Sequence, residues 1–312
     1  MNKAIKYRLY PTKEQEELFT KTFGCCRKRW NLMLADKIEH YKATKEMLQT
    51  TPAQYKKQEE YKYLKEVDSL ALANVQLHLQ TAYKNFFRDK KIGFPKFKSA
   101  KHSRKTYTTN NQNGTIFIAG NSIKLPKIGI VKAKIHRQPD TDWKIKSATI
   151  AQDNDGKFYV SVLFEFEKTI NQVPISNNVI GLDYKSDGLY ADSNGNVCGS
   201  PKYYRKSQKK LARLQRQLFR KEVGSNNRNK ARLKVARLQK HIANQRLDFV
   251  HKKSTEIANE YDVVCIESLD MKNMSNKGFG NGKATLDNGY KNDRDTNASL
   301  NIKKEGLRLL TI

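Results

Sequence analysis

Positive charge is the feature of this sequence that most limits what the chain can fold into. Its 312 residues include 60 Lys and Arg against 31 Asp and Glu, a formal net charge of +29 at pH 7. A compact fold with that excess repels itself unless a polyanion neutralises it. Each phosphate that a cation neutralises releases a counterion, so the composition favours nucleic acid as the partner. A cationic ribosomal protein or a membrane-surface protein is the alternative, although no basic segment has the clean apolar face that a membrane interface requires.

The sequence carries no signal for export or membrane insertion. No apolar run approaches the roughly 20 residues of a spanning helix, and residues 1–9 alternate instead of forming a signal peptide. We therefore expect an intracellular, cytoplasmic protein with no membrane partner. The cysteines include no Cys-x-x-Cys pair, so we expect no zinc and buried or incidental thiols at Cys25, Cys26, Cys198 and Cys265.

The first part of the chain reads as one strand followed by helices. Residues 3–10 alternate as a strand, and Thr12 with Gln15 forms a capping box that opens a helix reaching about Asp36. The charged, Tyr-rich stretch 40–68 is predicted as helical with a loop near its Thr-Pro pair. A stronger apolar periodicity then predicts a helix from about Leu70 to Arg88.

Further along, the pattern changes twice. Between 90 and 168, short alternating runs separated by Gly, Pro and Asn predict an antiparallel sheet or a small barrel. The stretch 169–178 is a linker and marks a domain boundary. Beyond it we predict a strand over 178–182, followed by a hairpin with its turn at Asn194-Gly195. Two basic helices over 201–222 and 228–259 come next. A buried strand over 261–267, a loop over 272–292 and a last helix that starts near Thr296 complete the chain.

The two basic helices indicate contact with a nucleic-acid backbone. Between Arg205 and Arg246 the chain has fifteen Lys or Arg residues and one acid, Glu222. A charged helix face is usually only solvated, but helices supported by their own ion pairs mix both signs. We therefore predict phosphate contacts at Lys206, Lys209, Lys210, Arg213, Arg216 and Arg220.

Aromatic and cationic residues alternate between Phe86 and Tyr107. Aromatic rings beside cations are a common way to hold single strands. The alternative is a core of phenylalanines with lysines reaching outward, which we favour for Phe86, Phe94 and Phe97. We predict nucleic-acid contacts at Lys96, Lys98, Arg104 and Tyr107, and also at Arg27 and Arg29.

Three carboxylates form the strongest candidate for a catalytic site. Asp183 and Glu267 each stand at the C-terminal end of a predicted buried strand, and Asp295 begins a helix. Nucleases with a ribonuclease H-like fold use such a trio to hold two Mg²⁺ ions beside the scissile phosphate. The alternative is that the three acids cap turns and helices.

Motifs spread over nearly the whole chain resemble the TnpB family, transposon-encoded RNA-guided nucleases related to the compact type V CRISPR effectors. They occur in the order of that family: YRLYPTKEQ (7–15), CRKRWN (26–31), AYKNFF (82–87), GFPKFKS (93–99), LPKIGIVK (125–132), IGLDYKSDGLY (180–190), VVCIESLDMKNMS (263–275) and DRDTNASLNI (293–302).

The resemblance implies a multidomain α/β protein. A wedge-like β-barrel would comprise 1–10 and 90–172, and a helical recognition insertion would comprise 11–89. A RuvC (ribonuclease H-like) domain would follow over 178–312, with the basic helical pair 201–259 inside it. The partners would be a guide RNA and target double-stranded DNA, read beside a short adjacent motif. The family's carboxylates would be Asp183, Glu267 and Asp295, with Mg²⁺ as their metal.

The sequence also departs from the family pattern. The family has a helix, a strand and a Cys-x-x-Cys ribbon between its Glu and its last Asp, whereas here residues 268–294 alone separate Glu267 from Asp295. Ser268 stands where the family commonly has Asp. We therefore expect a truncated RuvC domain without a zinc ribbon, with vestigial carboxylates and Asp295 on a loose tether.

The resulting hypothesis is an RNA-guided DNA-binding protein that represses transcription without cleaving DNA. Gln76 and Gln80, four residues apart on one helix, are candidate readers of the adjacent motif because Gln pairs with adenine edges. Whether the chain is an enzyme is left open. A minimal active Mg²⁺-dependent endonuclease is the first alternative, and a nonspecific RNA-binding accessory protein of a transposon is the second.

Overall fold

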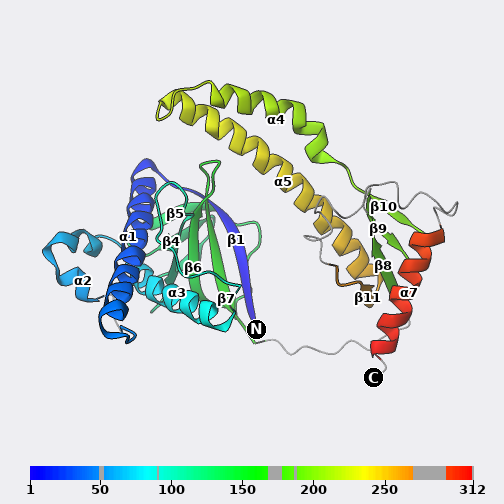
Figure 1. The fold of residues 1–312 in the computed structure, drawn as a ribbon, viewed down its shortest axis with the longest axis horizontal. Helices are drawn as coiled ribbons and strands as arrows, with labels where there is room; N and C mark the ends of the chain where they lie inside the picture. Colours follow the sequence, from blue (N-terminus) through cyan, green and yellow to red (C-terminus); the bar gives the residue numbers. More distant parts are fainter. Residues whose placement is uncertain (49–52, 90, 168–177, 186–187, 270–292, 311–312) are drawn as a thin grey trace. The chain divides into compact units, whose positions relative to one another are not determined.

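The computed structural model describes residues 1–48, 53–89, 91–167, 178–185, 188–269 and 293–310, without the side chains of 293–297 and 309–310. The chain divides into two compact units, Met1–Thr169 and Ile170–Ile312, and each is described by itself (Figure 1). The division falls inside the predicted linker, whose own conformation lies outside the described residues.

A seven-stranded antiparallel sheet forms the centre of the first unit (Figure 1). Its order is β2-β6-β7-β1-β5-β4-β3, so β2 and β3 are its edges. Among the described residues no pairing joins these two edges into the closed barrel that we expected. The strands are β1 (Asn2–Tyr10), β2 (Lys105–Asn110), β3 (Phe117–Ala119), β4 (Ser122–Leu125), β5 (Gly129–Lys134), β6 (Lys144–Gln152) and β7 (Phe158–Glu165).

The first strand of the chain lies inside this sheet because its sequence alternates. Ile5, Tyr7 and Leu9 are buried while the residues between them are not. A shift of one residue in pairing would expose all three, so the alternation also sets the register. β1 pairs with β7 from Asn2↔Glu165 to Leu9↔Phe158 and with β5 at its end, which joins the two ends of the unit's sequence.

Helices α1 (Lys13–Thr44) and α3 (Ser69–Arg88) pack against β2 of this sheet. The short α2 (Ala53–Lys57) and the 3₁₀ segment η1 (Glu59–Lys65) lie between them in the chain. The predicted capping box is present, because Gln15 N donates to Thr12 Oγ1 and Thr12 N donates to Gln15 Oε1. α1 continues past the predicted end at Asp36, since no Gly or Pro stands between Asp36 and Lys45, where the backbone turns left-handed at φ +60°.

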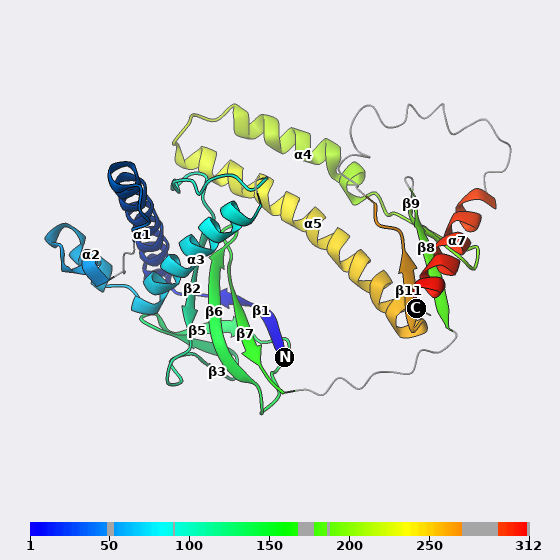
Figure 2. The ribbon, with the colours of Figure 1, turned by 60° about the horizontal axis from the view of Figure 1, so that its bottom comes forward.

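The second unit contains a four-stranded sheet in the order β10-β9-β8-β11. The strands β8 (Val179–Tyr184), β9 (Gly188–Asp192) and β10 (Val197–Gly199) are antiparallel, and β11 (Val263–Ile266) is parallel to β8. A turn at Asn194-Gly195 joins β9 to β10, but it is not the type I′ turn that this pair favours, because Gly195 has a positive φ of +85° and Asn194 does not. Helices α4 (Tyr203–Phe219) and α5 (Asn226–Glu260) form the connection from β10 to β11, and α7 (Asp293–Leu310) lies against the sheet (Figures 1 and 2).

Candidate nucleic-acid interface

The strand register brings two of the predicted carboxylates together. Ile266 on β11 pairs with Leu182 on β8, and the residues that follow them are Glu267 and Asp183. Because equivalent positions of neighbouring parallel strands point to the same face, these two acids belong to one face of the sheet. Asp183 is half-buried and Glu267 is exposed. Both acids lie at the C-terminal ends of strands, although β11 is not the buried strand that we predicted, since Val264 is 39 % and Ile266 71 % exposed.

Helix α7 packs on that same face through two glycines. A Cβ at Gly181, two residues before Asp183, would stand 2.0 Å from the Ser299 carbonyl oxygen, and a Cβ at Gly306 would stand 2.1 Å from Cys265 Sγ. Asp295 lies in the first turn of α7, four residues before Ser299, and its side chain lies outside the described residues. The segment that we expected to be a loose tether lies mostly outside the described residues, and from Ser299 onward α7 is in direct contact with β8 and β11.

The chemistry of Asp183 and Glu267 suits a hard cation. Carboxylate oxygens are the ligands of Mg²⁺, which binds through one or two carboxylates while phosphate oxygens and water supply the rest. Among the residues with described side chains, no three His, Cys, Asp or Glu residues stand close enough to hold a metal by themselves. The described donor set is therefore the two acids.

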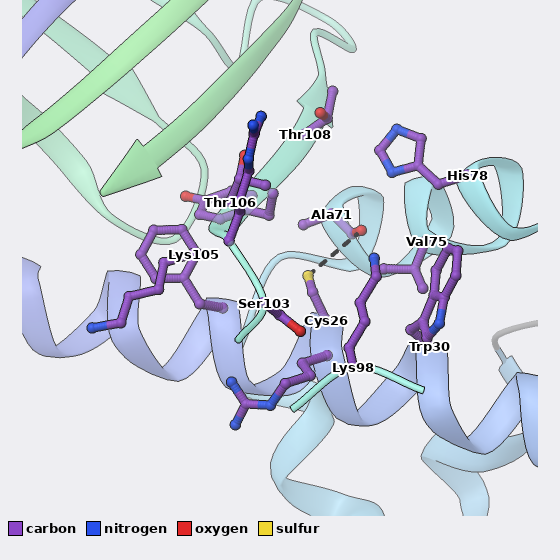
Figure 3. A pocket seen from close by; sticks show the side chains of 14 residues that line it. Cys26, Trp30, Ala71, Val75, His78, Lys98, Ser103, Lys105, Thr106 and Thr108 are labelled. Carbon is purple, nitrogen blue, oxygen red and sulfur yellow. Dashed lines mark hydrogen bonds between the residues drawn. The ribbon is translucent and has the colours of Figure 1, made fainter. Parts of the chain in front are cut away.

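A pocket of about 360 Å³ lies between α1, α3 and β2 in the first unit (Figure 3). Its floor is apolar, formed in part by Phe23, Ala71 and Val75, and its described lining contains cations but no carboxylate. Burial, with a smaller effect from Lys98, lowers the pKa of His78, and burial also lowers the pKa of Lys98. The cationic lining residues are Arg27, Lys98, Arg104 and Lys105.

Two sequence motifs meet at the wall of this pocket. Asn31 on α1 brackets the backbone of Lys98, donating to its carbonyl at 2.9 Å and accepting from its N–H at 2.8 Å. Trp30 Nε1 donates to the Lys96 carbonyl at 3.0 Å. These bonds fix the backbone of residues 96–98 on α1, and Lys98 Nζ lies 3.7 Å from the centre of the Trp30 ring. The CRKRWN and GFPKFKS motifs therefore form one structural element.

Some of the nucleic-acid contacts predicted in the first unit lie at the pocket, and others are buried. Arg27, Lys98 and Arg104 line the pocket, and Lys96 is exposed beside it. Arg29 is fully buried with its guanidinium 4.0 Å from the Tyr55 ring, so its prediction as a surface contact is wrong in this fold. The reason is helical spacing, which turns Arg29 toward Tyr55 of α2 while Arg27 faces the pocket.

Tyr107 is also part of the core. It is 5 % exposed, its ring lies 5.7 Å from that of Phe23, and burial raises its pKa well above the usual value. It forms pocket floor and offers no exposed ring for stacking, which corrects the prediction. Gln76 is half-buried and Gln80 exposed on α3, and both lie outside the set that lines the pocket.

The phenylalanines that we assigned to the core are more exposed than we predicted. Phe94 is 44 % exposed and Phe97 58 % exposed, while Phe86 is half-buried. Phe94 makes edge contacts with Phe86 and Tyr83 at ring separations of 5.4 and 5.5 Å. The rings pack on one another at the C-terminal end of α3, where the buried face formed by Leu72, Val75 and Leu79 has ended.

The predicted basic helices form an antiparallel hairpin of α4 and α5, shown side by side in Figures 1 and 2. Leu211 of α4 and Val235 and Ile242 of α5 are buried in the hairpin. At about 100° per residue, the six predicted cations of α4 and its C-cap fall in a stripe about 120° wide. All six are exposed: Lys206, Lys209, Lys210, Arg213, Arg216 and Arg220.

Some residues of the interface escaped the sequence-based predictions. Trp30, His78 and the hydroxyl residues of β2 line the pocket, although nothing in their local pattern assigns them a role. The available signal was the alternation in KTYTTN, residues 105–110, which marks a strand with one buried face. The convergence of α1, α3 and β2 has no counterpart in the sequence.

Together these features define a class: a two-unit mixed α/β protein with paired acids at the ends of parallel strands and cationic surfaces in both units. Residues 161–278 match the OrfB family of IS605, described as "Probable transposase", and residues 1–46 match its "Helix-turn-helix domain". In this structure residues 1–46 contain a strand, β1, and one long helix, α1.

Curated relatives are similar over most of the chain. A "Putative RNA-guided DNA endonuclease" of Streptomyces pristinaespiralis is 35% identical over 288 residues, covering 89% of this chain and 69% of that protein. InsQ of Escherichia coli K12, with the same description, is 34% identical over 282 residues, covering 89% and 68%. The chain belongs to the TnpB family of IS605-type transposon proteins.

A solved structure shares the fold. The Cas12f1 chain in a complex with sgRNA and target DNA aligns with a TM-score of 0.53 at 11% identity, covering 97% of this chain and 88% of that chain. Within the described residues, no helix has the length and apolar character to cross a lipid bilayer.

Proposed function

We propose that this chain binds a guide RNA and, through base pairing by that RNA, a complementary double-stranded DNA beside a short adjacent motif. The relatives' descriptions as RNA-guided DNA endonucleases support the proposal. The observation that carries it is the α4–α5 hairpin, whose α4 presents an exposed cation stripe within a segment, Arg205 to Arg246, in which Glu222 is the one acid. Such a stripe binds phosphates without reading sequence, which leaves sequence choice to base pairing.

The proposed outcome of binding is occupation of the DNA without cleavage, which would repress transcription. Support comes from the shortness of segment 268–294, the only part of the chain between Glu267 and Asp295. Mg²⁺ demands near-ideal octahedral geometry, and a misplacement of ~1 Å can reduce a rate about a hundredfold. Binding needs only the cationic surfaces.

The experiment is to purify the full chain from cells and sequence the RNA that copurifies. One discrete structured RNA supports guidance, and a broad mixture of cellular RNA indicates the nonspecific accessory role instead. The loaded protein is then incubated with a duplex complementary to the guide and with a scrambled duplex. Selective retention of the complementary duplex is expected, together with lower expression of a reporter that carries the matching site.

A second candidate function, metal-dependent DNA cleavage, is favoured by the register of Asp183 and Glu267 and the docking of α7 on their face. These two acids would hold Mg²⁺, which when bound stabilises charge on phosphate oxygens and activates water. The test is incubation of the loaded protein with target DNA and Mg²⁺ or Mn²⁺. Cleavage that Glu267→Gln abolishes would replace the non-cleaving proposal, whereas intact DNA that stays bound supports it.

A further inference from the structure

The tip of the α4–α5 hairpin exposes two large apolar side chains. Phe219, the last residue of α4, is 76 % exposed, and Val223 in the turn is 82 % exposed. Among the described residues these are the two most exposed large apolar side chains. Exposed apolar side chains gathered at one point of a surface mark contact sites more often than isolated ones do.

The tip is ordered by its own hydrogen bonds. Arg228 Nη1 donates to the carbonyls of Lys221 at 2.7 Å and Leu218 at 3.3 Å. Ser225 Oγ donates to the Glu222 carbonyl at 2.9 Å and accepts from Arg228 N at 3.1 Å as the N-cap of α5. The carbonyls at the end of α4 thus bind a cation, which also complements the helix dipole. Phe219 and Val223 are therefore held outward by a braced turn.

Cations surround the two apolar side chains. Arg216 and Arg220 belong to the exposed stripe of α4, and Lys221 follows them, all three exposed beside one acid, Glu222. A stable protein interface buries about 800 Å² on each partner, far more than two side chains supply. One aromatic ring beside phosphate-binding cations is instead the arrangement that holds a single nucleobase.

The width of the tip limits which base it can reach. Each helix is about 10–12 Å across, so a two-helix tip is too wide for a DNA minor groove of about 6 Å. Bases of RNA loops, bulges and ends lie outside the stack and commonly bind to aromatic side chains. We propose that Phe219 stacks on an unpaired or terminal base of the guide RNA, with Val223 packing against its edge. This inference rests on the proposed guide-RNA binding.

The test measures binding of the copurified RNA, resynthesised, to the full chain over a range of salt concentrations. Phe219→Ala is expected to weaken binding about 5- to 100-fold, the range for loss of one stacked base. Phe219→Trp keeps a flat ring and is expected to stay within about threefold of wild type. Because neither change alters charge, the slope of log affinity against log salt stays the same.

Leu247→Ala is the matched control, since Leu247 is 55 % exposed on α5 of the same hairpin. It should bind as wild type does. Ultraviolet crosslinking should join the Phe219 peptide to one nucleotide. Equal binding by Phe219→Ala and wild type overturns the inference while leaving guide-RNA binding intact. A fall in the melting temperature of RNA-free Phe219→Ala, with unchanged binding, also overturns it and indicates that the tip packs on protein. Failure of wild type to bind any discrete RNA contradicts the proposed function itself.

Discussion

Gly181 of β8 lies directly against the backbone of Ser299 in α7, so closely that a Cβ at position 181 would stand 2.0 Å from the Ser299 carbonyl oxygen. The contact joins the strand of Asp183 to the helix of Asp295. The glycine of the GLD motif therefore has a packing role that is separate from the acid beside it.

Gly181→Ala is expected to displace α7 from the sheet. The added methyl meets backbone rather than a flexible side chain, and overpacking of this kind costs about 1–3 kcal/mol or more. Urea unfolding should show lower stability, and hydrogen exchange of α7 should increase. Gly199→Ala in β10 is the control, because nothing lies within 4 Å of its added Cβ. Unchanged exchange in α7 would show that the helix does not depend on this contact.

Lys98→Met is expected to weaken nucleic-acid binding at the pocket. The change keeps the side-chain stem over Trp30 and removes the charge. Because burial lowers the pKa of Lys98, the wild-type lysine loses its proton at a lower pH than an exposed lysine, so affinity should fall as pH rises, and Lys98→Arg should resist that fall. Binding titrations between pH 7 and pH 10 measure this. The control is Lys146→Met, whose ammonium is paired with Glu165 at 2.8 Å; an equal effect of both variants would contradict a special role for the pocket.

Arg213→Gln in α4 is expected to lower the salt dependence of binding. One lost phosphate contact reduces the slope of log affinity against log salt by about 0.7–0.9. Lys252→Gln removes the same charge from a lysine that already pairs with Asp248 at 2.8 Å, so its slope should change less. Filter binding over 50–400 mM salt is the measurement, and equal slopes for the two variants would place the bound phosphates elsewhere.

Cys26 should make the first unit sensitive to alkaline pH. Burial, more than the nearby charges, raises the pKa of its thiol to about 12, above the ordinary 9.0. The unfolded chain therefore releases this proton first, and the stability from the buried neutral thiol is present below pH 9 and lost as pH rises toward 12. At pH 10 the loss is about 1.4 kcal/mol. Denaturant unfolding of wild type and Cys26→Ala should show a smaller decline for the variant; parallel declines would exclude this thiol.

Arg29→Met is expected to leave stability unchanged or to raise it by about 1–3 kcal/mol. No described group accepts a hydrogen bond from Nε, Nη1 or Nη2 of the buried guanidinium, and burial lowers its pKa to about 10. An apolar side chain of similar length avoids that desolvation, as replacement of buried charges often does. Arg29→Lys, which loses the flat stacking on Tyr55, should be the less stable variant in thermal unfolding. A strong loss in Arg29→Met would reveal a partner for the guanidinium.

Local pattern was sufficient for most elements of this fold. The Thr12–Gln15 capping box and the alternation of β1 form as their sequences predict, and a turn forms at Asn194-Gly195, because each depends on neighbours within a few residues. Charge alone also indicated a polyanionic partner.

Side-chain environment was less predictable than backbone structure. Arg29 and Tyr107 are buried although they belong to basic segments, and Phe94 and Phe97 are exposed although they are apolar. Whether such a residue is covered depends on which distant element packs over it. For Arg29 that element brings Tyr55, and for Tyr107 it is the α1 face with Phe23.

The amino-acid sequence by itself determined the order of strands and helices, the large positive charge and the family motifs, because these follow from local periodicity and residue type. Only the tertiary structure decided that Asp183 and Glu267 stand side by side, that α7 docks through Gly181, and that Arg27 and Lys98 share one pocket. Those relationships join residues far apart in the chain, and they depend on strand register and close packing, which no local pattern encodes.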